Sequence, residues 1–151
     1  MRRRIPVVLA VVAVAMTLSA AHANAATTQH CVVHVIGHKP SGEFITTSPA
    51  CFSSLAAARS SLSPSTFTLA THYDGFNFTG SSFSVVGSDC NGGWLNVATS
   101  WNDRISSTAN GCGHVKHFKD ANLSGISETT SYPGGNLGAL NNLTTSIQYL
   151  T

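Results

Sequence analysis

From residue 67 onward, apolar and polar residues alternate in short stretches that are separated by glycine, asparagine and serine. This period predicts β-strands with one buried face, and the separating residues are those that favour tight turns. Only 9% of the residues are charged, and the composition does not suit a helical bundle, whose outer faces need many charged side chains. We therefore expect an all-β domain at 67–151.

The preceding segment, 27–66, has a different pattern. Two β-prone runs at 31–37 and 43–47 are separated by a Pro-Ser-Gly turn, and an alanine- and leucine-rich run follows at 54–62. Alanine and leucine favour helix, a serine stands at the start of this run as an N-cap, and Pro64 ends it. We expect a small ββα-like segment, to which the sequence assigns no chemistry.

The first residues have the pattern of a secretory signal peptide. Three arginines at 2–4 precede an apolar run of ten residues at 7–16, and small residues follow at the positions that signal peptidase reads. We expect removal of 1–25 by cleavage after Ala25, with cleavage after Ala23 as the alternative. A membrane anchor is less favoured, because a spanning helix needs roughly 20 apolar residues. The prediction is a secreted, extracellular chain that has no membrane contact once the signal is removed.

Removal of the signal changes the charge balance. Three of the eight Lys and Arg residues leave with it, so five basic residues remain against six acidic ones, a formal charge of −1. Binding to a phosphate backbone needs several cations on one face, and no cluster of Lys and Arg remains. Nucleic acid is therefore not an expected partner.

The four cysteines are expected to form disulfides, because an even count in an exported chain is typical of a disulfide framework. Four cysteines allow three pairings. We favour Cys31–Cys51 and Cys90–Cys112, because each pair lies within one structural unit. Each bond would close a loop of about 20 residues and contribute roughly 3 kcal/mol in the chain-entropy model.

Two sequence elements recur within 67–151. The first, at 73–80, is repeated 45 residues later at 118–125: an aromatic residue leads, an apolar residue follows five places on, and glycine falls seven places on. The second element, at 102–107, has the form Asn-Asp-x-x-Ser-Ser, and it is echoed at 141–146 as Asn-Asn-x-x-Thr-Ser. Because both copies occur in the same order, two diverged repeats of one unit explain the pattern.

The first element resembles the Greek-key signature of the βγ-crystallin superfamily. That signature is an aromatic residue, four residues, an aromatic or apolar residue, one residue, and glycine. The matching positions are Tyr73, Phe78 and Gly80 in the first copy and Phe118, Leu123 and Gly125 in the second. The resemblance implies a double Greek-key β-sandwich, with Greek keys at about 67–108 and 113–151, in which each glycine takes a positive φ at a folded hairpin. The alternative is an unrelated β-sandwich whose turns need glycine.

The second element resembles the calcium signature of microbial members of this superfamily: two Asn or Asp residues, two variable residues, Ser or Thr, and Ser. Both copies fit it at every position. The stretches are also suited to calcium chemically, since Ca²⁺ binds carboxylate, amide, hydroxyl and carbonyl oxygens. The resemblance implies one or two calcium ions, held by each stretch and by a carbonyl from the partner motif near Asp74 or Lys119. The alternative is that both stretches are only turn and capping motifs.

The expected ligands are the polar side chains of each stretch and the carbonyl of its first variable residue. They are Asn102, Asp103, Ser106 and the Arg104 carbonyl in the first stretch, and Asn141, Asn142, Thr145 and the Leu143 carbonyl in the second. In this grouping Asp103 and Ser106 share one site, and Asn142 and Thr145 share the other. Asp103 is the one carboxylate in either stretch, so we expect its site to be tighter. Sites with few charges bind weakly, at roughly 10⁻⁵ to 10⁻³ M.

Other chemistries are less well supported. His30, His34 and His38 share a strand face but extend too far to hold one ion, and His114 and His117 point to opposite faces of their strand. The sequence contains no Gly-x-Ser-x-Gly elbow and no paired carboxylates suited to glycoside hydrolysis. We expect Trp94 and Trp101 to be packing residues and the protein not to be an enzyme.

Two other functions remain open. The chain also resembles small secreted bacterial metalloprotease inhibitors, which share the Greek-key architecture. If the chain is such an inhibitor, its partner is a secreted protease. The loops at 89–93 and 111–113, if tied by a disulfide, could supply an inhibitory loop. A toxin-like or cell-wall-interacting protein of the same fold is the second alternative.

Overall fold

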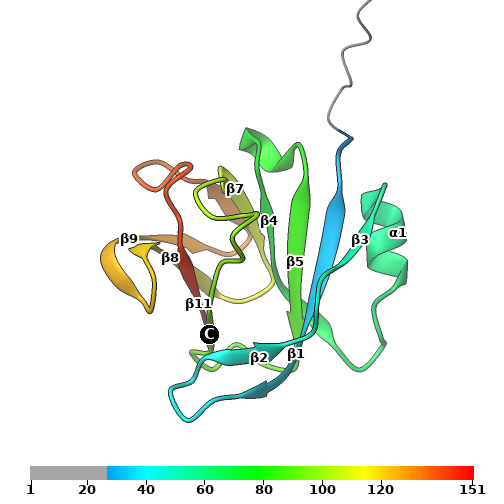
Figure 1. Ribbon diagram of the computed structural model, residues 1–151, viewed down its shortest axis with the longest axis horizontal. Helices are drawn as coiled ribbons and strands as arrows, with labels where there is room; N and C mark the ends of the chain where they lie inside the picture. The colour runs from blue at the N-terminus through cyan, green and yellow to red at the C-terminus, as the bar shows by residue number, and fades with distance from the viewer. Residues whose placement is uncertain (1–26) are drawn as a thin grey trace, which may run out of the picture.

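The computed structural model describes residues 27–151, which are mostly β-structure with one short α-helix (Figure 1). The expected signal peptide, 1–25, lies outside the described residues. Within the described part, no helix is both long enough and apolar enough to cross a membrane. The elements are β1 (His30–His38), β2 (Phe44–Thr46), β3 (Ala50–Phe52), α1 (Leu55–Ser60), β4 (Phe67–Tyr73), the 3-10 helix η1 (Phe76–Phe78), β5 (Ser82–Gly87), β6 (Trp94–Asn96), β7 (Ser107–Asn110), β8 (His114–Asp120), β9 (Ser124–Ser131), β10 (Gly134–Asn136) and β11 (Ser146–Leu150).

The strands form two sheets, and each repeat contributes to both. The first sheet has the order β10-β7-β4-β5-β1-β2, with β3 paired to β1, and the second has the order β6-β11-β8-β9. Strand β6 belongs to the first repeat but pairs with β11, and β10 belongs to the second repeat but pairs with β7. Because of this exchange, neither repeat completes its own sheet, and the two are expected to fold as one unit.

The main core lies between the sheets and draws on both repeats. Leu69, Val85, Ile105, Val115 and Ile147 are fully buried in one cluster. Both tryptophans are buried as well, as their predicted packing role requires. Burial of each large aliphatic side chain stabilises the fold by about 1.5–3 kcal/mol, so this cluster is the main source of stability.

The hairpin glycines have the backbone geometry predicted for them. Gly80 has φ +81° and Gly125 has φ +76°, both in the left-handed region. A Cβ atom at Gly80 would clash with the carboxylate of Asp74, and one at Gly125 would clash with that of Asp120. Glycine is therefore required in each hairpin for two reasons, the backbone angle and the close approach of a side chain.

The N-terminal segment extends the first sheet. Strand β1 pairs in parallel with β5, and the two lie side by side in Figure 1. The two predicted strands and the helix are present, and Ser54 caps the helix by accepting a hydrogen bond from the Ala57 backbone N–H. The structure adds a strand that the sequence analysis did not predict, β3, because Ala50, Cys51 and Phe52 pair with the start of β1.

Both predicted disulfides are confirmed. Cys31–Cys51 joins β1 to β3, and Cys90–Cys112 joins the loop before β6 to the turn between β7 and β8. No free cysteine remains in 27–151. Two disulfides indicate an oxidising environment.

A pair of histidines lies at the centre of the molecule. His72 and His117 occupy equivalent positions in the two repeats, each directly before the leading aromatic residue of its hairpin, and both are fully buried. Their rings are 5.5 Å apart, and His72 Nε2 lies 3.0 Å from the Tyr149 hydroxyl. Neither nitrogen of His117 nor Nδ1 of His72 has a hydrogen-bond partner.

Burial sets the protonation of this pair. Loss of hydration on burial lowers the pKa of His117 to about 3. The nearby Glu128 backbone opposes part of this shift, although it is not in hydrogen-bond geometry with the ring. Burial, and then the neighbouring His117, lowers the pKa of His72 well below its usual value. Both rings are therefore neutral near pH 7, because a charged ring here would have no counter-charge.

Candidate metal centre

The two Asn/Asp-rich stretches, far apart in sequence, lie directly beside each other. The backbone N–H of Asp103 donates to the Thr144 carbonyl at 3.2 Å, and that of Asn142 donates to the Ile105 carbonyl at 2.9 Å. Asp103 and Asn142 hold equivalent positions, and each has φ +56°. Asn and Asp tolerate this left-handed conformation better than most residues. The stretches thus form one paired site rather than two separate turns.

Each stretch is fixed to the hairpin of its own repeat by a buried serine. Ser107 donates its hydroxyl to the Gly75 carbonyl at 2.6 Å and accepts the Phe78 backbone N–H at 3.0 Å. Ser146 makes the equivalent contacts, donating to the Asp120 carbonyl at 2.6 Å and accepting the Leu123 backbone N–H at 3.0 Å. The last position of each stretch therefore orients its loop and is not free to bind a metal.

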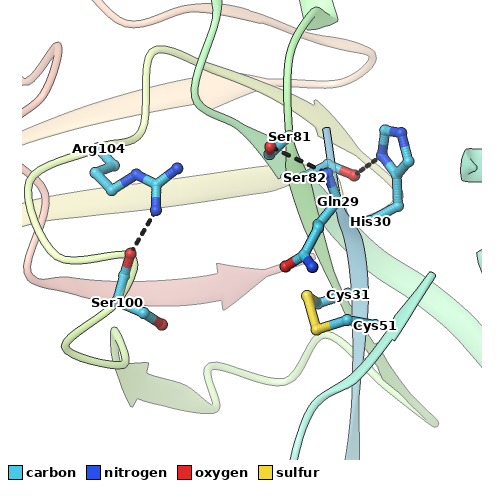
Figure 2. Close-up of a disulfide and its surroundings, with 8 residues drawn as sticks. All are labelled: Gln29, His30, Cys31, Cys51, Ser81, Ser82, Ser100 and Arg104. Atoms are coloured by element: carbon cyan, nitrogen blue, oxygen red, sulfur yellow. Dashed lines mark hydrogen bonds between the residues drawn. A yellow bond between two sulfur atoms is a disulfide. The ribbon is translucent and has the colours of Figure 1, made fainter. Parts of the chain in front are cut away.

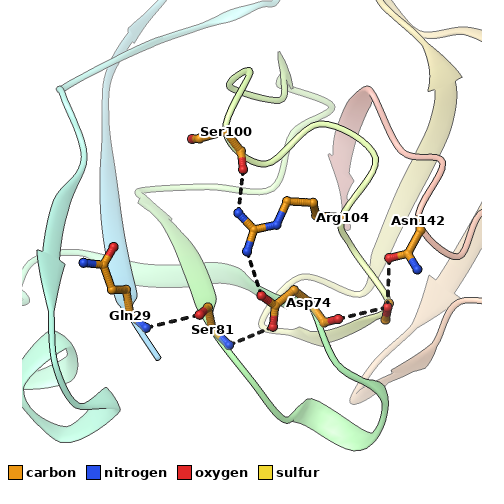
Figure 3. Close-up of polar contacts among 7 residues, drawn as sticks. Gln29, Asp74, Ser81, Ser100, Arg104 and Asn142 are labelled. Atoms are coloured by element: carbon orange, nitrogen blue, oxygen red, sulfur yellow. Dashed lines mark hydrogen bonds and ion pairs between the residues drawn. The ribbon is translucent and has the colours of Figure 1, made fainter. Parts of the chain in front are cut away.

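Three oxygens from different parts of the chain converge at Ser106, and Figure 3 labels the two residues that its hydroxyl contacts, Asp74 and Asn142. The Ser106 hydroxyl lies 3.2 Å from the Asp74 carbonyl oxygen and 3.1 Å from Asn142 Oδ1. A hydroxyl has one proton, so it can satisfy only one of these two acceptors fully. This cluster therefore contains acceptor lone pairs that the single Ser106 proton does not satisfy.

The contacts group the expected ligands differently from the sequence analysis. The hydroxyl of Ser106, in the first stretch, contacts the side chain of Asn142, in the second, whereas the expected grouping placed Ser106 with Asp103. The Asp103 carboxylate instead accepts a hydrogen bond from the Asn102 side chain at 2.8 Å, and it is exposed. Ser106 contacts a residue of the other stretch because the two stretches run side by side. The spacing of residues within one stretch cannot reveal which residue of the other stretch lies opposite.

The charges around the two halves differ. Arg104 forms an ion pair with Asp74 at 2.8 Å and donates to the Ser100 carbonyl at 2.8 Å (Figure 3). It also packs over the ring of Trp101. The carboxylate of Asp74 is thus neutralised, and the oxygen cluster at Ser106 contains no free anionic ligand.

The second stretch carries an unsatisfied buried oxygen. Asn141 Oδ1 is buried and has no hydrogen-bond partner, whereas the equivalent Asn102 is bonded to Asp103. Thr145, four residues further on, is half-buried, and its backbone N–H donates to the Phe118 carbonyl at 2.9 Å. Leu143, whose carbonyl was expected to bind, is an exposed residue. A buried oxygen without a hydrogen-bond donor lowers the stability of the fold.

A soft-metal site is not evident. In 27–151, no group of three or more His, Cys, Asp and Glu side chains lies close enough to hold an ion. His114 is exposed and His117 is buried, so these two histidines do point to opposite faces of β8, as predicted. The potential ligand atoms that do lie close together are amide, hydroxyl and carbonyl oxygens, which suit a hard cation such as Ca²⁺.

The loop at 89–93, considered above for protease inhibition, packs against the body of the protein through its last two residues. Gly92 donates its backbone N–H to the Tyr149 carbonyl, and Gly93 packs so closely on Phe44 that a Cβ atom would clash. Asn91 is exposed at the tip. These contacts favour a packing role for the Cys90–Cys112 disulfide over a projecting inhibitory loop.

Sequence reasoning missed two features of this region. Asn136 and Asn96 each bond to the hairpin asparagine of the other repeat, Asn77 and Asn122 respectively, through side chain and backbone. The hairpin asparagines occupy equivalent positions in the two copies of the first element, but their partners lie in the exchanged strands, which the sequence did not reveal. The buried histidines were missed too, although both stand one place before a motif aromatic.

Comparisons with known proteins were made for the whole sequence and for the structure. No family model and no curated protein matches the sequence. Among solved structures, a βγ-crystallin domain from Clostridium beijerinckii is 22% identical, with a TM-score of 0.44, covering 55% of this chain and 99% of that one. A βγ-crystallin domain from Flavobacterium johnsoniae is 27% identical, with a TM-score of 0.43, covering 55% and 94%. The N-terminal domain of protein S is 18% identical, with a TM-score of 0.43, covering 54% and 94%. The structural match to microbial βγ-crystallin domains spans about half of this chain.

Proposed function

We propose that this chain is an exported, non-enzymatic protein that binds Ca²⁺ at the paired stretches 102–107 and 141–146, and that calcium stabilises its fold. The observation that carries the proposal is the convergence of the Ser106 hydroxyl, the Asp74 carbonyl and Asn142 Oδ1. These oxygens come from both repeats, so one cation would join the repeats to each other. Export is supported by the two disulfides and by the signal-like pattern at 1–25.

The proposed sites are crossed. The first takes Asn142, the Leu143 carbonyl, Ser106 and the Asp74 carbonyl. The second follows from the equivalence of the repeats and takes Asp103, the Arg104 carbonyl, Thr145 and the Lys119 carbonyl. When bound, Ca²⁺ supplies a positive charge that draws these oxygens together. The second site contains a free carboxylate, so it is the tighter one, and both belong in the weak range of roughly 10⁻⁵ to 10⁻³ M.

Stabilisation should follow from mass action. At a calcium concentration about 100 times Kd, one site adds about 2.7 kcal/mol to the free energy of unfolding. For a domain of this size, that corresponds to a rise in Tm of about 5–10 °C. Thermal unfolding of the exported, oxidised chain should show this rise in CaCl₂ relative to EDTA. An equal concentration of MgCl₂ should give a much smaller rise, because Mg²⁺ requires a rigid octahedral site and keeps its water.

The Asp103→Asn variant tests the ligand assignment. Asparagine keeps the shape and the left-handed backbone that Asn142 already adopts at the equivalent position, so the fold should be unaffected. The matched control is Asp89→Asn, in a loop outside both stretches. The calcium-dependent rise in Tm should shrink in Asp103→Asn and persist in Asp89→Asn. An absence of calcium-dependent stabilisation in the unmodified chain, with no heat of calcium binding, would refute the proposal.

A further inference from the structure

A cavity of about 330 Å³ lies between the N-terminal segment and the segment that includes β6 and the residues after it. The Cys31–Cys51 disulfide and Val33, from the N-terminal segment, form one wall, and Leu95, Trp101 and Arg104 form the other. Figure 2 shows the disulfide and the Arg104 side chain. A smaller hollow of about 190 Å³ shares Cys31, Trp101 and Arg104 with it and extends it toward Asp74. The cavity is therefore formed by parts of the chain that are distant in sequence.

Both walls are held in place before any ligand arrives. The disulfide ties β1 to β3 on one side. On the other side, the Arg104 guanidinium is fixed by three contacts: the Asp74 carboxylate, the Ser100 carbonyl and the ring of Trp101. Trp101 in turn packs edge-on against Phe83, with ring centroids 4.9 Å apart. Because the lining side chains are already fixed, a ligand that binds here would lose little free energy to ordering them. Preformed walls of this kind are typical of binding sites.

The lining defines the chemistry of the occupant. The aromatic and aliphatic side chains form an apolar interior, and the Gln29 amide and the Thr46 hydroxyl can supply a few hydrogen bonds. The side chains of Thr47 and Asn96 also line the cavity, but they already bond to His34 and Asn122. Arg104 is the one charged side chain among the residues that line the larger cavity, and Asp74 already neutralises it. A charged ligand would have to break that ion pair. The volume lies at the lower end of the range of about 300–1,000 Å³ for small-molecule sites, so a macromolecule or a long chain would not fit.

We propose that this cavity binds a small, uncharged, aromatic molecule of about the size of two fused rings, packed between Trp101 and the disulfide. This goes beyond calcium binding and does not depend on it: of the residues in the two calcium stretches, only Arg104 lines the cavity, and it does so through its side chain, whereas its carbonyl is the proposed calcium ligand.

The test uses 2-naphthol as the probe, with binding to the full exported chain measured by calorimetry and mapped by NMR. Ala98→Phe and Ser100→Phe place a ring into the cavity from the exposed loop that forms its edge. Ala56→Phe, on the exposed face of α1, is the matched control. We expect saturable one-to-one binding with shifts at the Trp101 indole and the Val33 methyl groups. Each blocking variant should weaken binding about tenfold or more, and the control should not.

Two further comparisons separate this proposal from the calcium proposal. Affinity for 2-naphthol should be similar in EDTA and in CaCl₂, and the charged analogue 2-naphthoate should bind more weakly than 2-naphthol. Binding that does not saturate, or that is unchanged in both blocking variants, would overturn the proposal whatever calcium does. Binding of 2-naphthol to a chain that fails to bind calcium would support the cavity and refute only the metal site.

Discussion

The two repeats share one backbone design and differ in charge. In both, a glycine folds the hairpin, a buried serine ties the loop to that hairpin, and an Asp or Asn with φ +56° begins the contact with the other loop. Around this common frame, the first repeat has Asp103 and the Asp74–Arg104 ion pair, whereas the second has the neutral Asn142 and an unpartnered Asn141 oxygen. The comparison indicates that hydroxyls and glycines preserve the shape of the paired loops, while the charged residues around them differ between the repeats. In the proposed calcium sites, those charges would set the affinity.

The largest expected effect concerns the histidine pair, which the two repeats share. Because burial holds the pKa of His117 near 3, the folded protein binds a proton less readily than the unfolded chain, whose histidines titrate near 6.5. The contribution of the neutral His117 to the free energy of unfolding is therefore fully present above about pH 6.5, and it is lost as the pH falls toward 3. The loss is about 1.4 kcal/mol per pH unit for His117, and His72 adds a loss of the same sign.

Urea unfolding between pH 7 and 4 measures this loss. At pH 4.5, His117 alone should have lowered the free energy of unfolding by about 2.7 kcal/mol. His117→Leu should make the pH dependence shallower, and His114→Leu, at an exposed position of the same strand, should leave it unchanged. A dependence that is equally steep in His117→Leu would show that this pair is not the source.

The next effect tests the shared frame. Ser107→Ala and Ser146→Ala each remove a hydroxyl that satisfies one backbone carbonyl and one N–H of the hairpin. We expect each variant to lose about 2 kcal/mol of unfolding free energy in EDTA, by similar amounts in the two repeats. Ser127→Ala, exposed on β9, is the control. Chemical unfolding with an unchanged m-value measures the loss, and a large difference between the two variants would contradict the equivalence of the repeats.

The smallest effect tests the difference in charge. Arg104→Gln removes the cation beside the Ser106 oxygens and releases the Asp74 carboxylate. Because the pair is partly exposed, the loss of stability should stay below about 1 kcal/mol. Calcium affinity at the Asn142 site should rise about two- to fivefold, since an anion then lies near the ion. Calorimetry measures this change, with Lys39→Gln, which removes another exposed ion pair far along the chain, as the control. Weaker calcium binding in Arg104→Gln would mean that Arg104 positions the site.

The parts of the fold that depend on local sequence could be predicted. The hairpin glycines, the helix cap at Ser54 and the pairing of the four cysteines each follow from residues whose type or spacing sets the conformation. The repeated elements also indicated two copies of one structural unit within 67–151. These features are encoded within short segments, so a single sequence suffices to find them.

The parts that depend on long-range packing could not be predicted. The parallel pairing of β1 with β5, the exchange of β6 and β10, and the cavity at Trp101 arise from contacts between distant segments. The same reason explains the grouping of Ser106 with Asn142, because spacing within one loop carries no information about the facing loop.

The crossed pairing of ligands is the central claim, and calcium titration of single and double variants tests it most directly. If Asp103 and Thr145 hold one ion, Asp103→Asn and Thr145→Ala should weaken the same calorimetric step, and the double variant should add little to either single change. Asp103→Asn with Ser106→Ala should instead weaken two separate steps, with additive effects. The opposite result, in which Asp103 and Ser106 are coupled while Asp103 and Thr145 are additive, would contradict the crossed site and restore the grouping within one stretch.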